Sequence, residues 1–69
     1  MNAKNFGLNL AKKRNKLGIS AYELSLRLGK DSTYINKIEN GKVNPSLPML
    51  FEIAEALGIE TYQLFMDEK

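Results

Sequence analysis

The sequence predicts an all-α domain, and three observations support this fold class. Apolar residues recur at the three- and four-residue spacing of helix faces, and no strand-like alternation of apolar and polar residues runs beyond four positions. Glycines and capping residues divide the chain into five short segments of this kind. The length of 69 residues, with 43% hydrophobic, suits one core. We therefore expect a compact bundle of five helices forming a single domain over residues 1–69.

The first predicted helix covers residues 5–17. One of its faces carries three apolar side chains and one cation: Phe6, Leu10, Leu17 and Arg14. An unpaired guanidinium on such a face is costly to desolvate, so the cation needs a partner unless it reaches solvent. Gly18 ends the helix.

The second predicted helix begins at Ala21, because Ser20 and Glu23 have the spacing of a capping box. It is about two turns long and ends at Gly29. Three of its residues are expected to face inward: Leu24, Ser25 and Leu28.

The third predicted helix follows a cap at Asp31 or Ser32 and ends at Asn40-Gly41. Its inward residues are Ile35 and Ile38. The second and third helices, joined by a tight glycine-containing turn, have the lengths of a helix-turn-helix. A plain helical bundle can share this pattern.

Ser46 caps the fourth predicted helix, with Pro48 in its first turn, and Gly58 closes it. Its apolar stripe has five members: Leu47, Leu50, Ile53, Ala54 and Leu57. Thr61 is expected to cap a short fifth helix. That helix carries Tyr62, Leu64, Phe65 and Met66.

The composition excludes whole classes of chemistry. The chain has no cysteine and no histidine, which removes disulfides, thiol nucleophiles, Cys/His zinc sites and the usual general base. A domain this small also has little room for a deep ligand pocket. We expect no enzyme activity, metal, cofactor or small-molecule ligand. With no signal-peptide pattern and no apolar stretch near 18 residues, the prediction is a cytoplasmic protein without a membrane partner.

The formal net charge of +2 conceals an uneven distribution. Residues 1–42 hold nine basic and three acidic groups, whereas residues 43–69 hold one basic and five acidic groups. The basic segment favours a polyanionic partner and leaves the acidic end for other contacts. On charge alone, a well-solvated surface is an equally good explanation.

The sequence resembles the phage repressor and Cro type of helix-turn-helix domain over about residues 6–66. The matching residues are Leu17-Gly18-Ile19-Ser20, Glu23-Leu24, Leu28-Gly29, Tyr34-Ile35, Ile38-Glu39-Asn40-Gly41-Lys42, Asn44-Pro45-Ser46 and Ile53-Ala54-Glu55-Ala56-Leu57-Gly58. The resemblance implies a five-helix, lambda-repressor-like fold. It also implies a transcriptional regulator that binds double-stranded operator DNA as a homodimer, with the third helix in the major groove.

The resemblance assigns roles to particular residues. The outward positions of the third helix match the base-contacting positions: Ser32, Thr33, Asn36 and Lys37. Phosphate contacts are expected from the start of the second helix and from the loop after the third, where Asn40 would offer its backbone N–H. The residues are Ser20, Ala21, Tyr22, Asn40, Lys42 and Asn44. Glu39 matches the partner of Arg14 in a structural ion pair, and Tyr62, Phe65 and Met66 match the dimerising region.

Four positions depart from the family pattern. Ala21 stands where glutamine is frequent, Ser25 where alanine is usual, and Lys30 where the turn commonly buries a small apolar side chain. Asp31 puts a negative charge at the end of the third helix nearest the DNA. These departures leave an alternative open, in which the helix-turn-helix is reused to bind a partner regulator.

Overall fold

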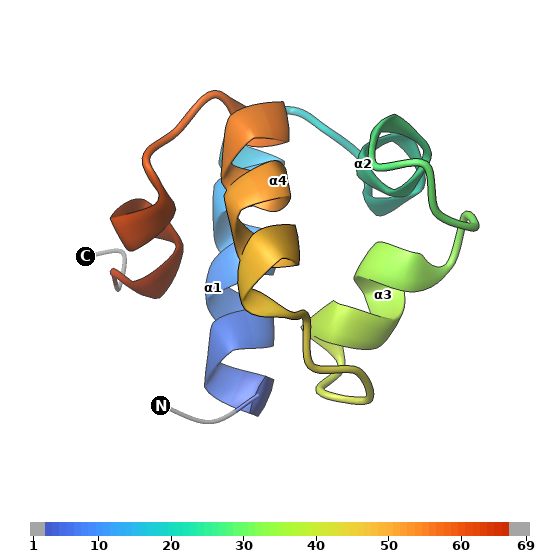
Figure 1. Cartoon of the computed structure of the whole chain (residues 1–69), viewed down its shortest axis with the longest axis horizontal. Coiled ribbons are helices and arrows are strands. Elements are labelled where there is room, and N and C mark those ends of the chain that lie inside the picture. The colour runs from blue at the N-terminus through green and yellow to red at the C-terminus, as the bar shows by residue number, and fades with distance from the viewer. Residues whose placement is uncertain (1–2, 67–69) are drawn as a thin grey trace.

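The computed structural model describes residues 3–66 and contains four α-helices and one 3₁₀ helix in that range (Figure 1). They are α1 (Ala3–Lys16), α2 (Ala21–Arg27), α3 (Tyr34–Glu39), α4 (Leu47–Leu57) and η1 (Thr61–Phe65). No strand occurs among the described residues, so the all-α prediction is confirmed.

The prediction of five α-helices is wrong at the C-terminal end, where η1 is a 3₁₀ helix of five residues. The predicted cap is also wrong, because Glu60 rather than Thr61 is the N-cap. The Glu60 backbone N–H donates to Oε1 of Gln63 at 2.8 Å, and the Glu60 side chain accepts from the backbone of Gln63 in return. The chain leaves the helix at Met66 with extended backbone, so the segment stays within the short length typical of 3₁₀ structure.

Local signals set the other helix boundaries. The Ser20 hydroxyl accepts from the backbone N–H of Glu23 at 2.9 Å, and the Ser46 hydroxyl accepts from that of Met49 at 3.3 Å. Gly58 ends α4 in the left-handed conformation with φ of 72°. The predicted starts of α2 and α4 and the end of α4 are confirmed.

The core draws on every helix of the described chain. Its buried apolar members are Phe6, Leu10, Ala21, Leu24, Ile35, Ile38, Met49, Ile53, Ala54, Leu57 and Leu64. Two predicted core residues are wrong, since Leu17 and Leu47 are about half exposed or more. Leu17 lies beyond the end of α1, and in α4 the buried face begins at Met49, four residues before Ile53.

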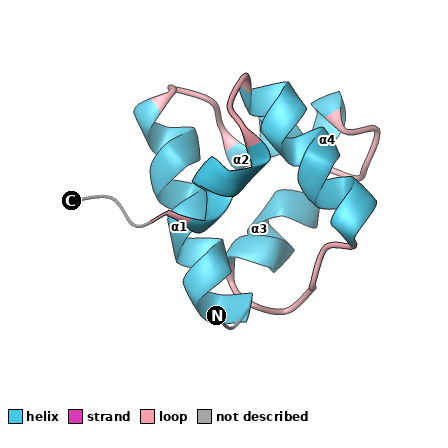
Figure 2. Cartoon of the chain, turned by 60° about the vertical axis from the view of Figure 1, so that its left-hand side comes forward, coloured by secondary structure: helices cyan, strands magenta, loops and turns pink. Residues whose placement is uncertain are grey.

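α3 packs against α1 and α2 (Figure 2). The approach to α1 is close because α1 carries Gly7 at the crossing. A Cβ on Gly7 would lie only 2.4 Å from the backbone oxygen of Glu39 and 2.7 Å from that of Ile38. Any larger residue would push the end of α3 away from α1.

Candidate nucleic-acid interface

α2 and α3 lie on one side of α1 and α4, and η1 lies on the other (Figure 1). The turn between α2 and α3 passes through Gly29, whose φ of 73° only glycine adopts readily. This arrangement is the helix-turn-helix expected from the sequence, and it leaves one face of α3 uncovered.

The uncovered face of α3 carries two of the predicted base-contacting residues. Asn36 and Lys37 are exposed, whereas Ile35 and Ile38 are fully buried. Amide and ammonium groups at these positions are able to hydrogen-bond base edges in a major groove.

The N-terminus of α3 differs from the prediction. Thr33, not Asp31 or Ser32, is the N-cap, and its side chain makes no capping bond. Asp31 instead closes the preceding turn: its Oδ1 accepts from the backbone N–H of Thr33 at 2.9 Å and from the Thr33 hydroxyl at 2.6 Å. These two hydrogen bonds hold the pKa of Asp31 below its ordinary value. Thr33 is exposed but its hydroxyl proton is engaged, and Ser32 is partly buried.

Arg14 of α1 forms a bidentate ion pair with Glu39 at the end of α3. Its Nε lies 2.7 Å from Oε2 and its Nη2 lies 2.9 Å from Oε1, with both side chains about nine-tenths buried. A third donor, Nη1, reaches the backbone oxygen of Ile19 at 2.9 Å. The hydrogen bond to Glu39, more than the charge of that carboxylate, raises the pKa of Arg14 against the opposing effect of burial. Arg14 therefore connects α1 to α3 through Glu39, and to the turn before α2 through Ile19.

The three predicted phosphate-contacting residues at the start of α2 differ in exposure. Ser20 and Tyr22 are exposed, whereas the Ala21 side chain belongs to the core. Ala21 can therefore act on a ligand only through its backbone N–H, one of the first groups of the helix that have no intrahelical acceptor.

Three backbone N–H groups at the end of α3, those of Asn40, Gly41 and Lys42, donate back to carbonyl oxygens of α3. The expectation of an available Asn40 N–H is wrong, because this group donates to the backbone oxygen of Asn36 at 3.0 Å. The N–H of Lys42 likewise donates to the oxygen of Lys37 at 2.9 Å, as in a helix C-cap. The side chains of Asn40, Lys42 and Asn44 remain exposed.

Lys30 is exposed, and its ammonium lies 5.4 Å from the ring centroid of Tyr34. This cation–π contact explains how a lysine is accommodated in the turn. Burial, followed by the charge of Glu52, raises the pKa of Tyr34. The Lys30 ammonium therefore lies over the ring of Tyr34, the first residue of α3, and stays outside the core.

The sequence interpretation missed the role of Ser25 and the tight crossing at Gly7. The sequence correctly predicts that Ser25 faces inward, as a polar residue where alanine is usual, but gives no partner for its hydroxyl. Its buried hydroxyl hydrogen-bonds backbone groups of both α2 and α3, and only the three-dimensional structure reveals these partners.

At the opposite side of the molecule, η1 and the Met66 that follows it carry one buried and three exposed apolar side chains. Leu64 is fully buried, whereas Tyr62, Phe65 and Met66 are exposed by 64%, 40% and 53%. The ring of Phe65 also contacts Phe6, with centroids 5.5 Å apart. η1 therefore leaves an apolar surface beyond what the core uses.

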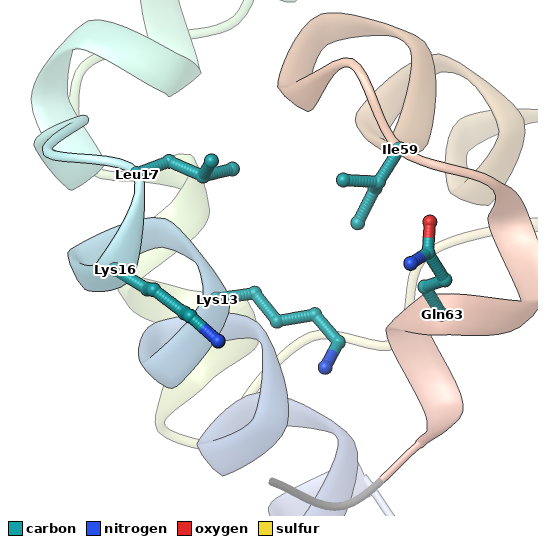
Figure 3. Close-up of a pocket in the computed structure, with 5 residues that line it drawn as sticks. All are labelled: Lys13, Lys16, Leu17, Ile59 and Gln63. Atoms are coloured by element: carbon teal, nitrogen blue, oxygen red, sulfur yellow. The ribbon is translucent and has the colours of Figure 1, made fainter.

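A groove of about 200 Å³ lies between the end of α1 and η1 (Figure 3). It is lined by Lys13, Lys16, Leu17, Ile59 and Gln63. Its volume is below the range of typical small-molecule sites. Within residues 3–66 there is no group of three His, Cys, Asp or Glu residues placed to hold a metal ion. No helix in that range is long and apolar enough to cross a bilayer.

A family model described as Helix-turn-helix matches residues 10–64, which include α2, α3 and α4. The chain belongs to this helix-turn-helix family. Control protein C.MunI from Mycoplasma sp. is 40% identical over 63 residues, covering 90% of this chain and 85% of the relative. The uncharacterized HTH-type transcriptional regulator y4dJ of Sinorhizobium fredii is 34% identical over 58 residues, covering 84% and 75%. The structure of the restriction-modification controller protein C.AhdI from Aeromonas hydrophila matches with a TM-score of 0.85 and 35% identity over 91% of each chain.

Membership places this helix-turn-helix protein among DNA-binding transcription regulators. The family resemblance inferred from the sequence and the prediction that the chain is not an enzyme are both confirmed.

Proposed function

We propose that this helix-turn-helix protein binds a specific operator in double-stranded DNA as a homodimer, with α3 in the major groove. The observation that carries the proposal is the uncovered face of α3. Asn36 and Lys37 project from a short helix whose other face is anchored by Ile35, Ile38 and the Arg14–Glu39 contact.

The proposed base contacts differ in chemistry. Asn36 suits adenine, and Lys37 suits O6 and N7 of guanine. Thr33 can offer its methyl group to thymine and its oxygen as an acceptor, because its hydroxyl proton already goes to Asp31. Ser32 has the shortest reach and is partly buried, so its contribution would pass through water.

The proposed phosphate contacts flank this face. On one side are Ser20, Tyr22 and the backbone N–H groups at the start of α2. On the other side are the side chains of Asn40, Lys42 and Asn44. Such contacts position the domain on the duplex without distinguishing sequences.

We place the dimer contact on η1, through Tyr62, Phe65 and Met66. Their exposed apolar surface supports the proposal, because a two-fold contact would remove it from water. A two-fold dimer with one α3 per half-site would contact two half-sites about 34 Å apart. Sedimentation of Tyr62→Glu should show loss of the dimer, whereas a wild-type protein that stays monomeric at high concentration with and without operator contradicts it.

The relatives favour one biological setting. C.MunI is named a control protein and C.AhdI a restriction-modification controller, and both align with most of this chain. A role as a controller of a restriction–modification system is the setting we propose for the regulator.

Selection of bound duplexes from random DNA at two salt concentrations tests the function. We expect a recurrent, near-palindromic site and an affinity that falls with salt by about 0.9 log units per log unit of salt for each phosphate contacted. Lys42→Ala should reduce that slope by about one, and Asn36→Ala should relax the preference at one base position. Lys12→Ala, which removes an exposed lysine of α1, is the matched control and should change neither. Equal affinity of the wild type for selected and scrambled duplexes contradicts the proposal.

The alternative is a helix-turn-helix that binds a partner regulator. The charged Asp31 beside α3 favours it, because a carboxylate there opposes a phosphate backbone. In the same selection, a protein of this kind would bind duplexes only weakly, and the bound duplexes would share no recurrent sequence.

A further inference from the structure

The buried side chain of Ser25 connects α2 to the first turn of α3. Its hydroxyl is inaccessible to solvent, donates to the backbone oxygen of Ala21 at 2.8 Å and accepts from the backbone N–H of Ile35 at 3.0 Å. The backbone oxygen of Ser25 accepts from the N–H groups of Leu28 at 3.2 Å and Lys30 at 3.0 Å. Ser25 thus forms hydrogen bonds with the end of α2, with the turn and with the start of α3.

α3 has no cap from its own sequence. It spans only six residues, and its N-cap Thr33 makes no side-chain hydrogen bond. The first N–H groups of a helix have no intrahelical acceptor, and a buried group of this kind needs a partner from elsewhere. Ser25 supplies that partner to Ile35 from a different helix.

This contact has a directional effect that apolar packing does not have. A hydrogen bond favours a near-linear geometry, so the Ser25 hydroxyl restricts how α3 can rotate about its axis. Burial of Ile35 and Ile38 holds α3 in place but sets its rotation less strictly, because the hydrophobic effect is not directional. Asn36 follows Ile35 immediately, so its direction depends on that rotation.

We propose that Ser25 is a positioning residue for DNA recognition, which sets the direction of Asn36 and Lys37 toward the base edges. The inference rests on the proposed DNA-binding function. It predicts that loss of the hydroxyl reduces sequence discrimination rather than general affinity for DNA.

The test compares Ser25→Ala with the wild type on two probes. One is the duplex recovered by the wild type from random DNA, and the other is a scrambled duplex of the same length and composition. Alanine is nearly the same size but removes the acceptor of the Ile35 N–H. The ratio of the two affinities should fall by about tenfold or more, the equivalent of one lost base contact. The affinity for the scrambled duplex should fall much less, because it depends on phosphate contacts, which do not distinguish sequences and are made in part by residues at the start of α2.

Ile53→Val is the matched control. It weakens the core in α4 without touching the hydrogen bond between Ser25 and Ile35, and a lower folded fraction reduces both affinities by the same factor. Amide hydrogen exchange adds a measurement independent of DNA, in which the Ile35 N–H should exchange faster in Ser25→Ala than in Ile53→Val. Ser25→Cys, whose thiol is a weak acceptor, should give an intermediate affinity ratio and serves if Ser25→Ala does not fold.

The outcomes separate this inference from the proposed function. A Ser25→Ala or Ser25→Cys protein with the wild-type ratio overturns the positioning role and leaves DNA recognition standing. Unchanged exchange of the Ile35 N–H overturns the contact itself. A wild type that does not distinguish the two duplexes overturns the proposed function and this inference with it.

Discussion

Replacing Arg14 with alanine should destabilise the domain by about 3 kcal/mol, the lower end of the range for breaking a buried ion pair. The side chains of Arg14 and Glu39 are only 11% and 9% exposed, so the substitution leaves a carboxylate that water reaches poorly. It also removes the donor to the backbone oxygen of Ile19. At about 4–8 °C per kcal/mol for a domain of this size, the melting temperature should fall by about 12–24 °C.

The pair between Arg27 and Glu23 provides an internal control. Its N···O distance is 2.6 Å, but the side chains are 46% and 48% exposed. Arg27→Ala should therefore cost less than about 1 kcal/mol. Thermal and urea unfolding followed by circular dichroism measures both variants under the same conditions.

A double-mutant cycle identifies the source of the loss. Arg14→Ala and Glu39→Ala together should destabilise the domain by less than the sum of the single changes, because neither charge is then left without a partner. A melting temperature for Arg14→Ala equal to that of Arg27→Ala would refute the reasoning, as would strict additivity in the cycle.

Three further predictions concern Gly7 and Asp31. Gly7→Ala should destabilise the domain by about 2 kcal/mol net in urea unfolding, because contact with the backbone of Glu39 outweighs the roughly 1 kcal/mol gained in helix propensity; a more stable variant contradicts the close crossing. Asp31→Asn keeps an oxygen for Thr33 and removes a charge that repels a phosphate backbone. DNA affinity should rise about twofold per domain at low salt and less at high salt, and a fall in affinity contradicts the proposed orientation. Because the pKa of Asp31 is lowered below 3.8, the stability from its carboxylate is complete above pH 3.8 and is lost as the pH falls through the lower folded-state pKa. The stability of the wild type relative to Asp31→Asn should therefore decrease on acidification below about pH 4, and a difference independent of pH contradicts this.

The helix boundaries that the sequence predicted correctly depend on short-range contacts. Ser20 and Ser46 each accept from a backbone N–H three residues ahead, and Gly58 adopts a left-handed backbone within the same turn that it ends. Such contacts involve only neighbouring residues, so a pattern of residue types is enough to indicate them.

The wrong predictions concern residues whose environment depends on other parts of the chain. Leu17 and Leu47 have helical spacing relative to the core residues, but Leu17 follows the end of α1, and Leu47 is the first residue of α4, ahead of the buried face that begins at Met49. Thr61 has the composition of a cap, yet Glu60 takes this role because Gln63 completes a reciprocal pair with it. Asp31 is a good capping residue as well, and here it bonds Thr33 in the turn before α3.

In the candidate site too, some features depend on neighbouring residues and others on residues distant in the chain. Periodicity is enough to separate Ile35 and Ile38 from Asn36 and Lys37, because the four residues share one helix. The direction of that helix depends on contacts with residues distant in the chain: Glu39 with Arg14 and Gly7 of α1, and Ile35 with Ser25 of α2. A six-residue helix cannot persist on its own propensity, so these contacts, and not the sequence of α3 alone, determine which of its side chains are exposed. It follows that transferring the outward residues of α3 to a relative should transfer its base preference only when the residues at positions 7, 14 and 25 make equivalent contacts.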